Sequence, residues 1–390
     1  MNTPLTSTHR IELVDFLRGF ALMAIILLHH LEHFNLFGHP KSTYEWLNIL
    51  DACVYKGIFF LFAGKAYSIF SILFGLSFWI QYRNAQQRGH SYDLRFMWRM
   101  IVLMVIAFCH ATFYNGDILM FYAVVGLLLP FLQKLKDRWL ILIVVVCFLQ
   151  PYDLYVAIES YLNPTQSFTI NRWSVYANQW AKVAETPNIW DNMVANWKYG
   201  LLFDNLWQIE NGRFFHLIIY YIIGMRLGKA NSFEVNKTNN DFWKYLFLIC
   251  LSLSVLSIAF IPEANALCTS KYFHHSYGII TEGLKKFFMT GVWISLLTLL
   301  WFRFKGMKWQ RWFVPYGRMS LTNYISQSIL GVFIYYPMGL GLYNKVGATI
   351  SVVIALIVFV SQCLFSWWWL RRYKQGPIEY VWKKLTWIRI

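Results

Sequence analysis

Apolar runs of membrane-spanning length recur along the whole chain and are separated by short polar segments. A helix needs about 20 mainly apolar residues to cross the hydrocarbon core of a bilayer. The pattern predicts an all-α polytopic membrane protein with about ten transmembrane helices, near residues 11–31, 58–82, 99–114, 117–133, 138–157, 213–229, 243–261, 279–302, 318–340 and 347–370. Only Asn115 and Gly116 separate the third and fourth runs, which predicts a tight helical hairpin. We expect residues 1–390 to form a single integral membrane domain.

The lysines and arginines of the connecting segments alternate between the two sides of the predicted helices. One side carries strongly basic segments at 83–99, 134–138, 226–244, 303–311 and 371–389. The other side has few basic residues, in segments 32–57, 115–116, 262–278 and 341–346. Because basic loops stay in the cytoplasm, this pattern predicts ten crossings with both termini cytoplasmic.

Residues 158–212 form a polar and aromatic segment between the fifth and sixth predicted helices. This segment is too long for a plain connection between neighbouring helices. We expect an extracytoplasmic insertion made of short helices that lie over the outer ends of the bundle. Two roles are compatible with it: a lid that binds an acceptor, and a passive interfacial cap.

The amino-acid composition indicates which partners the protein has. Of the 390 residues 57% are hydrophobic and 14% are charged, whereas a soluble domain has about 25% charged residues. The formal net charge of +16 would suit nucleic acid, but the basic residues follow the topology pattern, so we expect the lipid bilayer as partner and no nucleic acid. The sequence contains no P-loop, G-x-G-x-x-G, G-x-S-x-G or H-E-x-x-H motif, which argues against a nucleotide-driven pump or a familiar hydrolase.

The first predicted helix carries charged and titratable residues, which are costly inside a membrane and usually functional. Asp15 and Arg18 are three residues apart on one face, and His29 follows Arg18 by eleven residues, or about three turns, on the same side. A neutral imidazole at this depth is suited to accept a proton. Glu32 or Asp117 would orient its other ring nitrogen. We therefore take His29, Arg18 and Asp15 as the candidate catalytic residues, although Asp15 would serve equally as a simple partner of Arg18.

Further polar residues share the predicted outer depth and would line a cavity there. The candidates for substrate binding on this side are His33, His110, Asp117, Arg213 and His216. For His33 and its neighbour His30 a solvated position at a helix end is favoured, and Asp117 would also act as a helix cap. Arg213 begins a helix, where a cation is misplaced relative to the helix dipole, so we expect it to have a buried acidic or ligand partner.

Lys65 interrupts an apolar run and would either point inward or extend to the surface. The spacing of His29, His30 and His33 places only two of them on one helix face, so we expect no metal site.

Several segments resemble the YeiB-like family of bacterial membrane proteins, a domain of unknown function numbered 418. They are LVDFLRGFALMAIILLHH (13–30), AYSIFSILFGLSFWI (66–80), 99–131 with its NGDIL sequence, YGRMSLTNYISQSILG (316–331) and GPIEYVWKKLTW (376–387). This family is similar to a wider set of transmembrane acyltransferases, which includes the heparan-glucosaminide N-acetyltransferase and bacterial O-acyltransferases. In the O-acyltransferases a His thought to act in transfer follows the first-helix Arg by eleven residues, as His29 does here. YeiB-like proteins and the heparan enzyme usually have Asn there, and the working His of the heparan enzyme lies in the following loop, near His33 and His39 of this chain.

The resemblance implies acyl transfer from cytoplasmic acyl-CoA, with acetyl-CoA as the expected donor, to a hydroxyl or amine of an extracytoplasmic glycan or small-molecule acceptor. His29 would take the acceptor proton, and Arg18 would hold the donor or, through Asp15, the helix. Arg83, Arg99 and Arg318 would bind CoA phosphates, although a purely topological role is favoured for such arginines. Asn323 and Gln327 share a helix face and would bind ligand or, by preference, join helices.

The resemblance also implies a bacterial plasma (inner) membrane location and a homodimer. Two other functions stay open at this point. A transporter or flippase would use the same buried groups as a substrate or proton path, and a sensor would bind a ligand without turnover.

Overall fold

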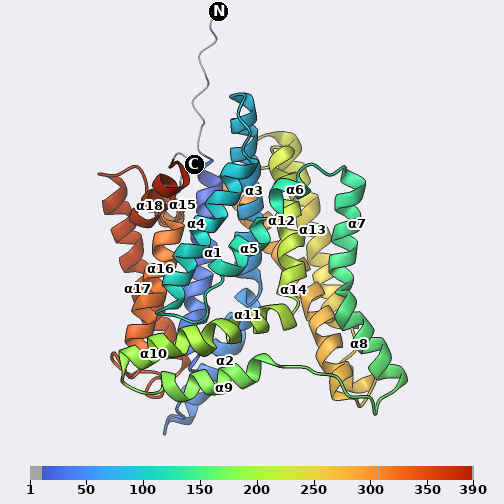
Figure 1. Cartoon of the computed structure of the whole chain (residues 1–390), viewed down its shortest axis with the longest axis vertical. Helices are drawn as coiled ribbons and strands as arrows, with labels where there is room; N and C mark the ends of the chain where they lie inside the picture. Colours follow the sequence, from blue (N-terminus) through green and yellow to red (C-terminus); the bar gives the residue numbers. More distant parts are fainter. Residues whose placement is uncertain (1–10, 305–306, 389–390) are drawn as a thin grey trace, which may run out of the picture.

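The computed structural model describes residues 11–304 and 307–388, and within them the chain forms helices and no strand. Most long helices run side by side as a bundle, whereas α9 (Trp173–Ala184), α10 (Ile189–Ala195) and α11 (Leu201–Glu210) lie across one end of it (Figure 1). We call this the cap end. The opposite end, where α1 (Glu12–Leu31) begins and α18 (Pro377–Thr386) lies, is called the terminal end. Parts of the predicted basic segments 303–311 and 371–389 lie outside the described residues.

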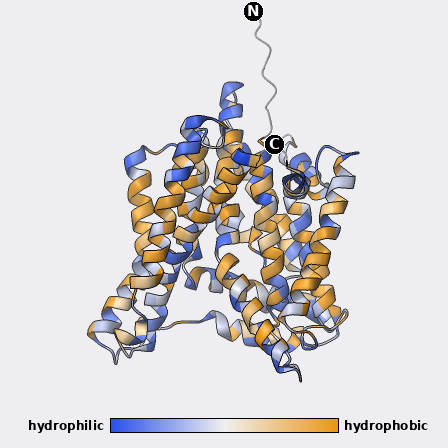
Figure 2. Ribbon diagram, turned by 180° about the vertical axis from the view of Figure 1, so that it is seen from behind, coloured by the Kyte–Doolittle hydropathy of each residue, from blue (hydrophilic) through white to orange (hydrophobic). Residues whose placement is uncertain are grey.

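A helix occupies each of the ten predicted apolar runs. Besides α1 these are α3 (Lys65–Gln87), α4 (Asp93–Ala111), α5 (Leu119–Gly126) with α6 (Leu129–Leu132), α7 (Asp137–Leu149) with α8 (Pro151–Leu162), α12 (Arg213–Lys229), α13 (Lys237–Phe260), α14 (Lys271–Phe304), α16 (Ser320–Tyr335) and α17 (Ala348–Leu370). Within residues 11–304 and 307–388, six helical segments are long and apolar enough to cross a membrane, or seven if α7 and α8 form one span. The middle parts of the long helices are mainly apolar, and polar residues are concentrated toward the two ends of the bundle (Figure 2). The chain is thus an all-helical, multi-pass membrane protein, whereas ten crossings and cytoplasmic termini stay predictions.

Two connecting segments differ from the sequence prediction. The expected outer loop 32–57 contains most of a helix, α2 (Glu45–Phe62), which continues into α3 after a break at Gly64. No residue of α2 is buried. Its polar residues Asn48, Asp51 and Lys56 interrupt the apolar run that would have marked it in the sequence. The segment between α4 and α5 runs from 112 to 118 and is not a tight turn at Asn115 and Gly116. Its longer path lets Asn115 and Asp117 turn inward and become buried.

The predicted span 138–157 is not one straight helix. α7 and α8 are bent by 41° at Gln150, whose φ of 45° is left-handed. Pro151 follows directly and disfavours a helical conformation of the residue before it. α8 continues to Leu162, into the segment 158–212 that was expected to form an insertion, and the short helices of this segment are α9, α10 and α11.

The backbones of α3 and α12 touch through glycines. A Cβ atom on Gly224 would lie 1.8 Å from the Ile72 carbonyl oxygen, and one on Gly75 would lie 2.3 Å from the Tyr221 carbonyl oxygen. Small residues allow such close approach in membrane helix pairs. This contact holds the wall of the cavity described below.

We expect Gly224→Ala to lower the thermal midpoint of the purified protein, followed by intrinsic tryptophan fluorescence. The two backbones must separate to admit the methyl group, which costs about 1–3 kcal/mol or more in a packed core. Gly278→Ala in α14 is the matched control, because nothing lies within 4 Å of its Cβ position. An unchanged midpoint in Gly224→Ala would contradict the close contact.

Candidate functional site

A cavity of about 730 Å³ extends from the terminal end into the bundle. Its lining is cationic toward the terminal end, where it contains Arg18, Arg83, Arg99, Arg318 and Lys383. Its inner part is apolar and aromatic and contains Ile25, Leu119, Tyr122 and Tyr324. The three arginines expected to bind a donor, Arg83, Arg99 and Arg318, therefore share one cavity with Arg18 and Asp15.

The segments that carry the family resemblance meet at this cavity. Its lining draws Asp15 and Arg18 from 13–30, Leu119 from 99–131, Tyr324 from 316–331 and Glu379 from 376–387. Glu379 explains one of these motifs, because its Oε1 accepts hydrogen bonds from the backbone N–H groups of Leu321 at 2.7 Å and Thr322 at 3.1 Å. It thus caps the first turn of α16 and fixes the mouth of the cavity.

Arg18 is held in place by its own helix and by α3. Its Nη1 donates to Asp15 Oδ1 at 3.0 Å, and its Nη2 donates to Ser77 Oγ. Asp15 is only 2% exposed. A buried carboxylate needs such a partner, so the pair fixes a guanidinium at the cavity wall.

Arg99 has a different environment. Its guanidinium stacks on the ring of Trp382 at 3.6 Å, and among the described residues it forms no ion pair. Arg18 is near enough to repel it. By contrast, Arg83 donates to Asn231 Oδ1 at 2.8 Å. A guanidinium in a cavity without a carboxylate partner is a natural site for an anionic ligand.

His29 lies beyond the inner end of this cavity, toward the cap end. It follows the cavity residue Ile25 by four positions, which is one turn or about 6 Å along α1. Its Nδ1 lies 3.3 Å from Glu32 Oε2 and 3.2 Å from the Tyr114 hydroxyl. No described residue bonds its Nε2, and the side chain is 19% exposed. If Nδ1 carries the proton, Nε2 is free to accept another.

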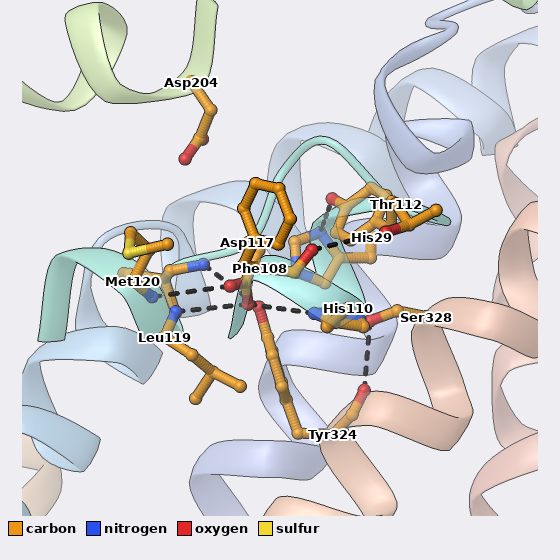
Figure 3. A network of polar contacts seen from close by, with 12 residues as sticks. His29, Phe108, His110, Thr112, Asp117, Leu119, Met120, Asp204, Tyr324 and Ser328 are labelled. Carbon is orange, nitrogen blue, oxygen red and sulfur yellow. Dashed lines mark hydrogen bonds and ion pairs between the residues drawn. The ribbon is translucent and has the colours of Figure 1, made fainter. Parts of the chain in front are cut away.

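A second imidazole–carboxylate pair lies beside His29 (Figure 3). His110 Nδ1 is 3.0 Å from Asp117 Oδ1, and both residues are buried. Asp117 also accepts from the backbone N–H groups of Leu119 and Met120, so its two expected roles, partner and cap, occur together. The His110 ring packs edge-on against the cavity residue Tyr324, with centroids 5.4 Å apart. A single layer of side chains therefore separates the cavity from the network at the cap end.

The chain that follows α1 has an unusual backbone. His33, Phe34, Asn35 and Phe37 all have left-handed conformations, with φ values of 44°, 54°, 79° and 51°. Such conformations cost about 1–3 kcal/mol each and cluster at functional sites. Tyr336 holds the loop by donating to the Phe34 carbonyl at 2.7 Å, so Glu32 starts a fixed segment beside His29.

The expectation that His30 and His33 are solvated is wrong, because both are fully buried. The left-handed residues turn the chain after α1 back toward α16 and α17. His30 Nδ1 lies 2.9 Å from the Tyr335 hydroxyl, and His33 Nε2 lies 2.8 Å from Ser351 Oγ. Burial, aided by His39, lowers the pKa of His33 to about 4, although backbone hydrogen bonds oppose the shift. His33 is thus neutral and joins α1 to α16 and α17.

The structure does not bring every expected substrate-binding residue to His29. His216 Nε2 lies 3.4 Å from Gln150 Nε2, at the bend between α7 and α8. Asn323 donates to the Tyr316 carbonyl and to Ser366 Oγ, both at 2.9 Å. Gln327 Oε1 accepts from the Tyr316 hydroxyl at 3.4 Å. The last two residues join α16 to α15 (Lys308–Arg318) and α17.

Arg213 has aromatic neighbours in place of the expected acidic partner. Its guanidinium lies 4.7 Å from the ring centre of Tyr67 and 4.3 Å from that of Trp207. Among the described residues it forms no ion pair. Lys65 is buried at 6% exposure, and its Nζ donates to the Phe60 carbonyl at 2.7 Å.

Four residues of this region were not among the predicted site residues: Tyr114, Tyr324, Trp382 and Asp204. Tyr324 and Trp382 lie inside segments that carry the family resemblance, and this position was the signal in the sequence that could have identified them. Asp204 descends from α11 on the side where Asp117 lies (Figure 3). Withdrawal from water, together with repulsion from Asp117, raises the pKa of Asp204 to about 7, although a hydrogen bond from Gln208 opposes the shift.

Two known protein families match different parts of the chain. Residues 10–173 match a family described as heparan-alpha-glucosaminide N-acetyltransferase, catalytic. Residues 227–389 match a family described as protein of unknown function (DUF418). Neither match includes residues 174–226, which contain most of the cap helices and most of α12.

Full-length relatives have only general names. An uncharacterized 39.9 kDa protein in the amylase 3' region of Bacillus acidopullulyticus is 27% identical, with 99% of this chain and 96% of that protein aligned. Uncharacterized protein YxaH of Bacillus subtilis is 24% identical, with 99% and 96% aligned. Uncharacterized protein YeiB of Escherichia coli is 24% identical, with 96% and 95% aligned.

Proposed function

The chain belongs to the YeiB-like family of membrane proteins (domain of unknown function 418), which is related to the heparan-alpha-glucosaminide N-acetyltransferase. From this relation and the site described above, we propose that the protein is a transmembrane acyltransferase. It moves an acyl group, in the first place acetyl, from acyl-CoA to a hydroxyl or amine of an acceptor such as a glycan. The terminal end faces the cytoplasm, and the cap end faces the outside of a bacterial plasma membrane.

One observation carries this proposal. The recognisable segments of the chain build a cavity that is cationic toward the terminal end, and its inner end lies one helical turn from His29. Phosphates of CoA suit the arginines, because guanidinium groups form strong paired hydrogen bonds with phosphate oxygens. The apolar inner part suits the pantetheine arm and the thioester. The network at the cap end then supplies a base where the acceptor arrives.

The chemistry follows from the position of His29. Its Nε2 takes the proton of the acceptor hydroxyl or amine while the oxygen or nitrogen attacks the thioester carbonyl. The new acyl–oxygen or acyl–nitrogen bond forms, the carbon–sulfur bond breaks, and the CoA thiolate leaves toward the cavity and is protonated there. Glu32 keeps the proton of the neutral ring on Nδ1, as an orienting carboxylate does in other sites of this kind.

Purified protein in lipid nanodiscs with radiolabelled acetyl-CoA tests this function. We expect acetyl-CoA to bind, free CoA to compete, and free thiol to appear slowly as water takes the place of the unknown acceptor. Protein without acetyl-CoA and acetyl-CoA with empty nanodiscs give the background. If no acyl-CoA binds and no thioester is consumed, the transferase function is wrong. Movement of a solute into proteoliposomes without thioester consumption would instead establish the transporter.

A further inference from the structure

Three cations from three helices gather in the cap-end half of the bundle, on the α12 and α14 side. They are Lys65 at the start of α3, Arg213 at the start of α12 and Lys286 in α14. A Cβ on Gly64 would lie 2.7 Å from Lys286 Cδ, so the Lys286 side chain passes directly beside Gly64, the residue before Lys65. Lys286 repels both Lys65 and Arg213 electrostatically. Cations placed together at membrane depth are unfavourable unless an anion joins them.

The neighbouring carboxylates do not balance this charge. Glu282 lies 3.3 Å from Lys285 Nζ and 3.9 Å from Lys286 Nζ, so one carboxylate is shared by two lysines. Asp204 is the other acidic neighbour of Arg213, and with a pKa of about 7 it is only partly ionised at neutral pH. Counted with Lys65 and Arg213, the group holds four cations against at most two ionised carboxylates, which leaves a surplus of at least two positive charges.

The contacts of Arg213 leave its guanidinium able to bind an anionic ligand. Tyr67 from α3 and Trp207 from α11 hold its guanidinium by the ring contacts described above, and stacking of this kind leaves the N–H edges of a guanidinium available. Arg213 also stands on the first turn of α12, which contains no acidic residue. The backbone N–H groups of a helix start add positive potential there.

We propose that Arg213, Lys65 and Lys286 form a binding site for a phosphate group at the cap end. A phosphate monoester carries a charge of about −1.5 to −2 at pH 7, which matches the surplus. Arg supplies paired donors, and the two lysines supply point charges, as in other phosphate sites.

The cap helix α11 connects this site to the His29 network. Trp207 holds Arg213, and Asp204, one turn earlier, extends toward Asp117 (Figure 3). A ligand whose phosphate rests on Arg213 therefore reaches toward His29 beneath α11. That the phosphate belongs to the acyl acceptor rests on the proposed function; the binding site itself does not.

Binding of inorganic phosphate to the full-length protein in phosphatidylcholine nanodiscs tests the site. We would follow the thermal midpoint while phosphate replaces chloride at constant ionic strength, without any acyl-CoA. We expect phosphate to raise the midpoint of the wild type, and the double variant Arg213→Gln, Lys286→Gln to require at least about tenfold more phosphate, because two charge-assisted contacts are lost. Lys271→Gln, which removes an exposed lysine of the same helix, should behave as the wild type.

Two further variants make the result specific. Arg99→Gln removes the guanidinium that we expect to bind phosphate at the terminal end, so the response that remains in this variant reports the cap-end site. Arg213→Lys should retain most of the response, because it keeps the charge. The site is refuted if the double variant responds as the wild type, or if Arg99→Gln alone abolishes the response. Failure of acyl transfer would leave a positive result unaffected.

The source of the phosphate is decided by competition. If the site takes soluble phosphorylated molecules, glucose 6-phosphate should mimic inorganic phosphate, whereas glucose should not. If it takes a lipid headgroup, nanodiscs that contain phosphatidic acid should remove the response to added phosphate in the wild type and leave the double variant unchanged. A response to phosphate that neither compound reproduces or removes would contradict recognition of a phosphate monoester.

Discussion

Replacement of His29 by alanine is expected to lower acetyl-CoA consumption by about 100- to 10,000-fold, the range of a lost general base. Binding of acetyl-CoA should change little, because the cavity ends one turn before this residue. The rate is measured by the release of free thiol, and binding by competition with labelled acetyl-CoA.

Two variants complete this experiment. His90→Ala, which removes an exposed histidine of the loop after α3, should keep the wild-type rate. Glu32→Gln should give an intermediate loss, because His29 stays but its Nδ1 loses an anionic partner. Full activity in His29→Ala together with a loss in His110→Ala would assign the base to the pair formed by His110 and Asp117.

Replacement of Arg99 by glutamine is expected to weaken acetyl-CoA binding by about 10- to 100-fold, since a hydrogen bond to a charged group contributes about 1.5–3 kcal/mol. The turnover rate at saturating donor should stay near that of the wild type, because Arg99 lies at the far end of the cavity from His29. The measurement is a titration of kcat and KM with acetyl-CoA.

Arg88→Gln is the control for charge, because Arg88 comes from the same basic segment but does not line the cavity. If both variants weaken binding equally, the arginines act only through the general field of the terminal end. If neither does, the donor does not occupy this cavity.

Much of the fold was predictable because a membrane constrains helices by length and apolarity. Every apolar run forms a helix, and the resemblance to YeiB-like proteins is confirmed. The errors occur where tertiary contacts decide the backbone. Gln150 takes a left-handed conformation that bends one predicted span, and α2 forms in a segment expected to be a loop although none of its residues is buried.

The site was predictable only in part. Arg18 and His29 stood out because polar groups inside an apolar run are costly, and Glu32 was a plausible partner from its spacing. The burial of His30 and His33 could not be foreseen, because it depends on four left-handed residues that bring the chain under α16. The shared cavity of Arg83, Arg99 and Arg318 depends on how four distant segments pack, which loop charge alone does not encode.

The thin layer around Tyr324 and Leu119, between the cavity and the network at the cap end, has an electrical consequence. Between two polar compartments the membrane voltage falls mainly across the apolar layer that separates them, and one elementary charge gains about 2.3 kcal/mol per 100 mV. An acetyl group is neutral, but each proposed transfer releases one proton at the cap end and takes one up on CoA at the terminal end. Turnover would then move one positive charge outward against an inside-negative potential, so the protein would be an electrogenic enzyme whose rate rises when the membrane is depolarised.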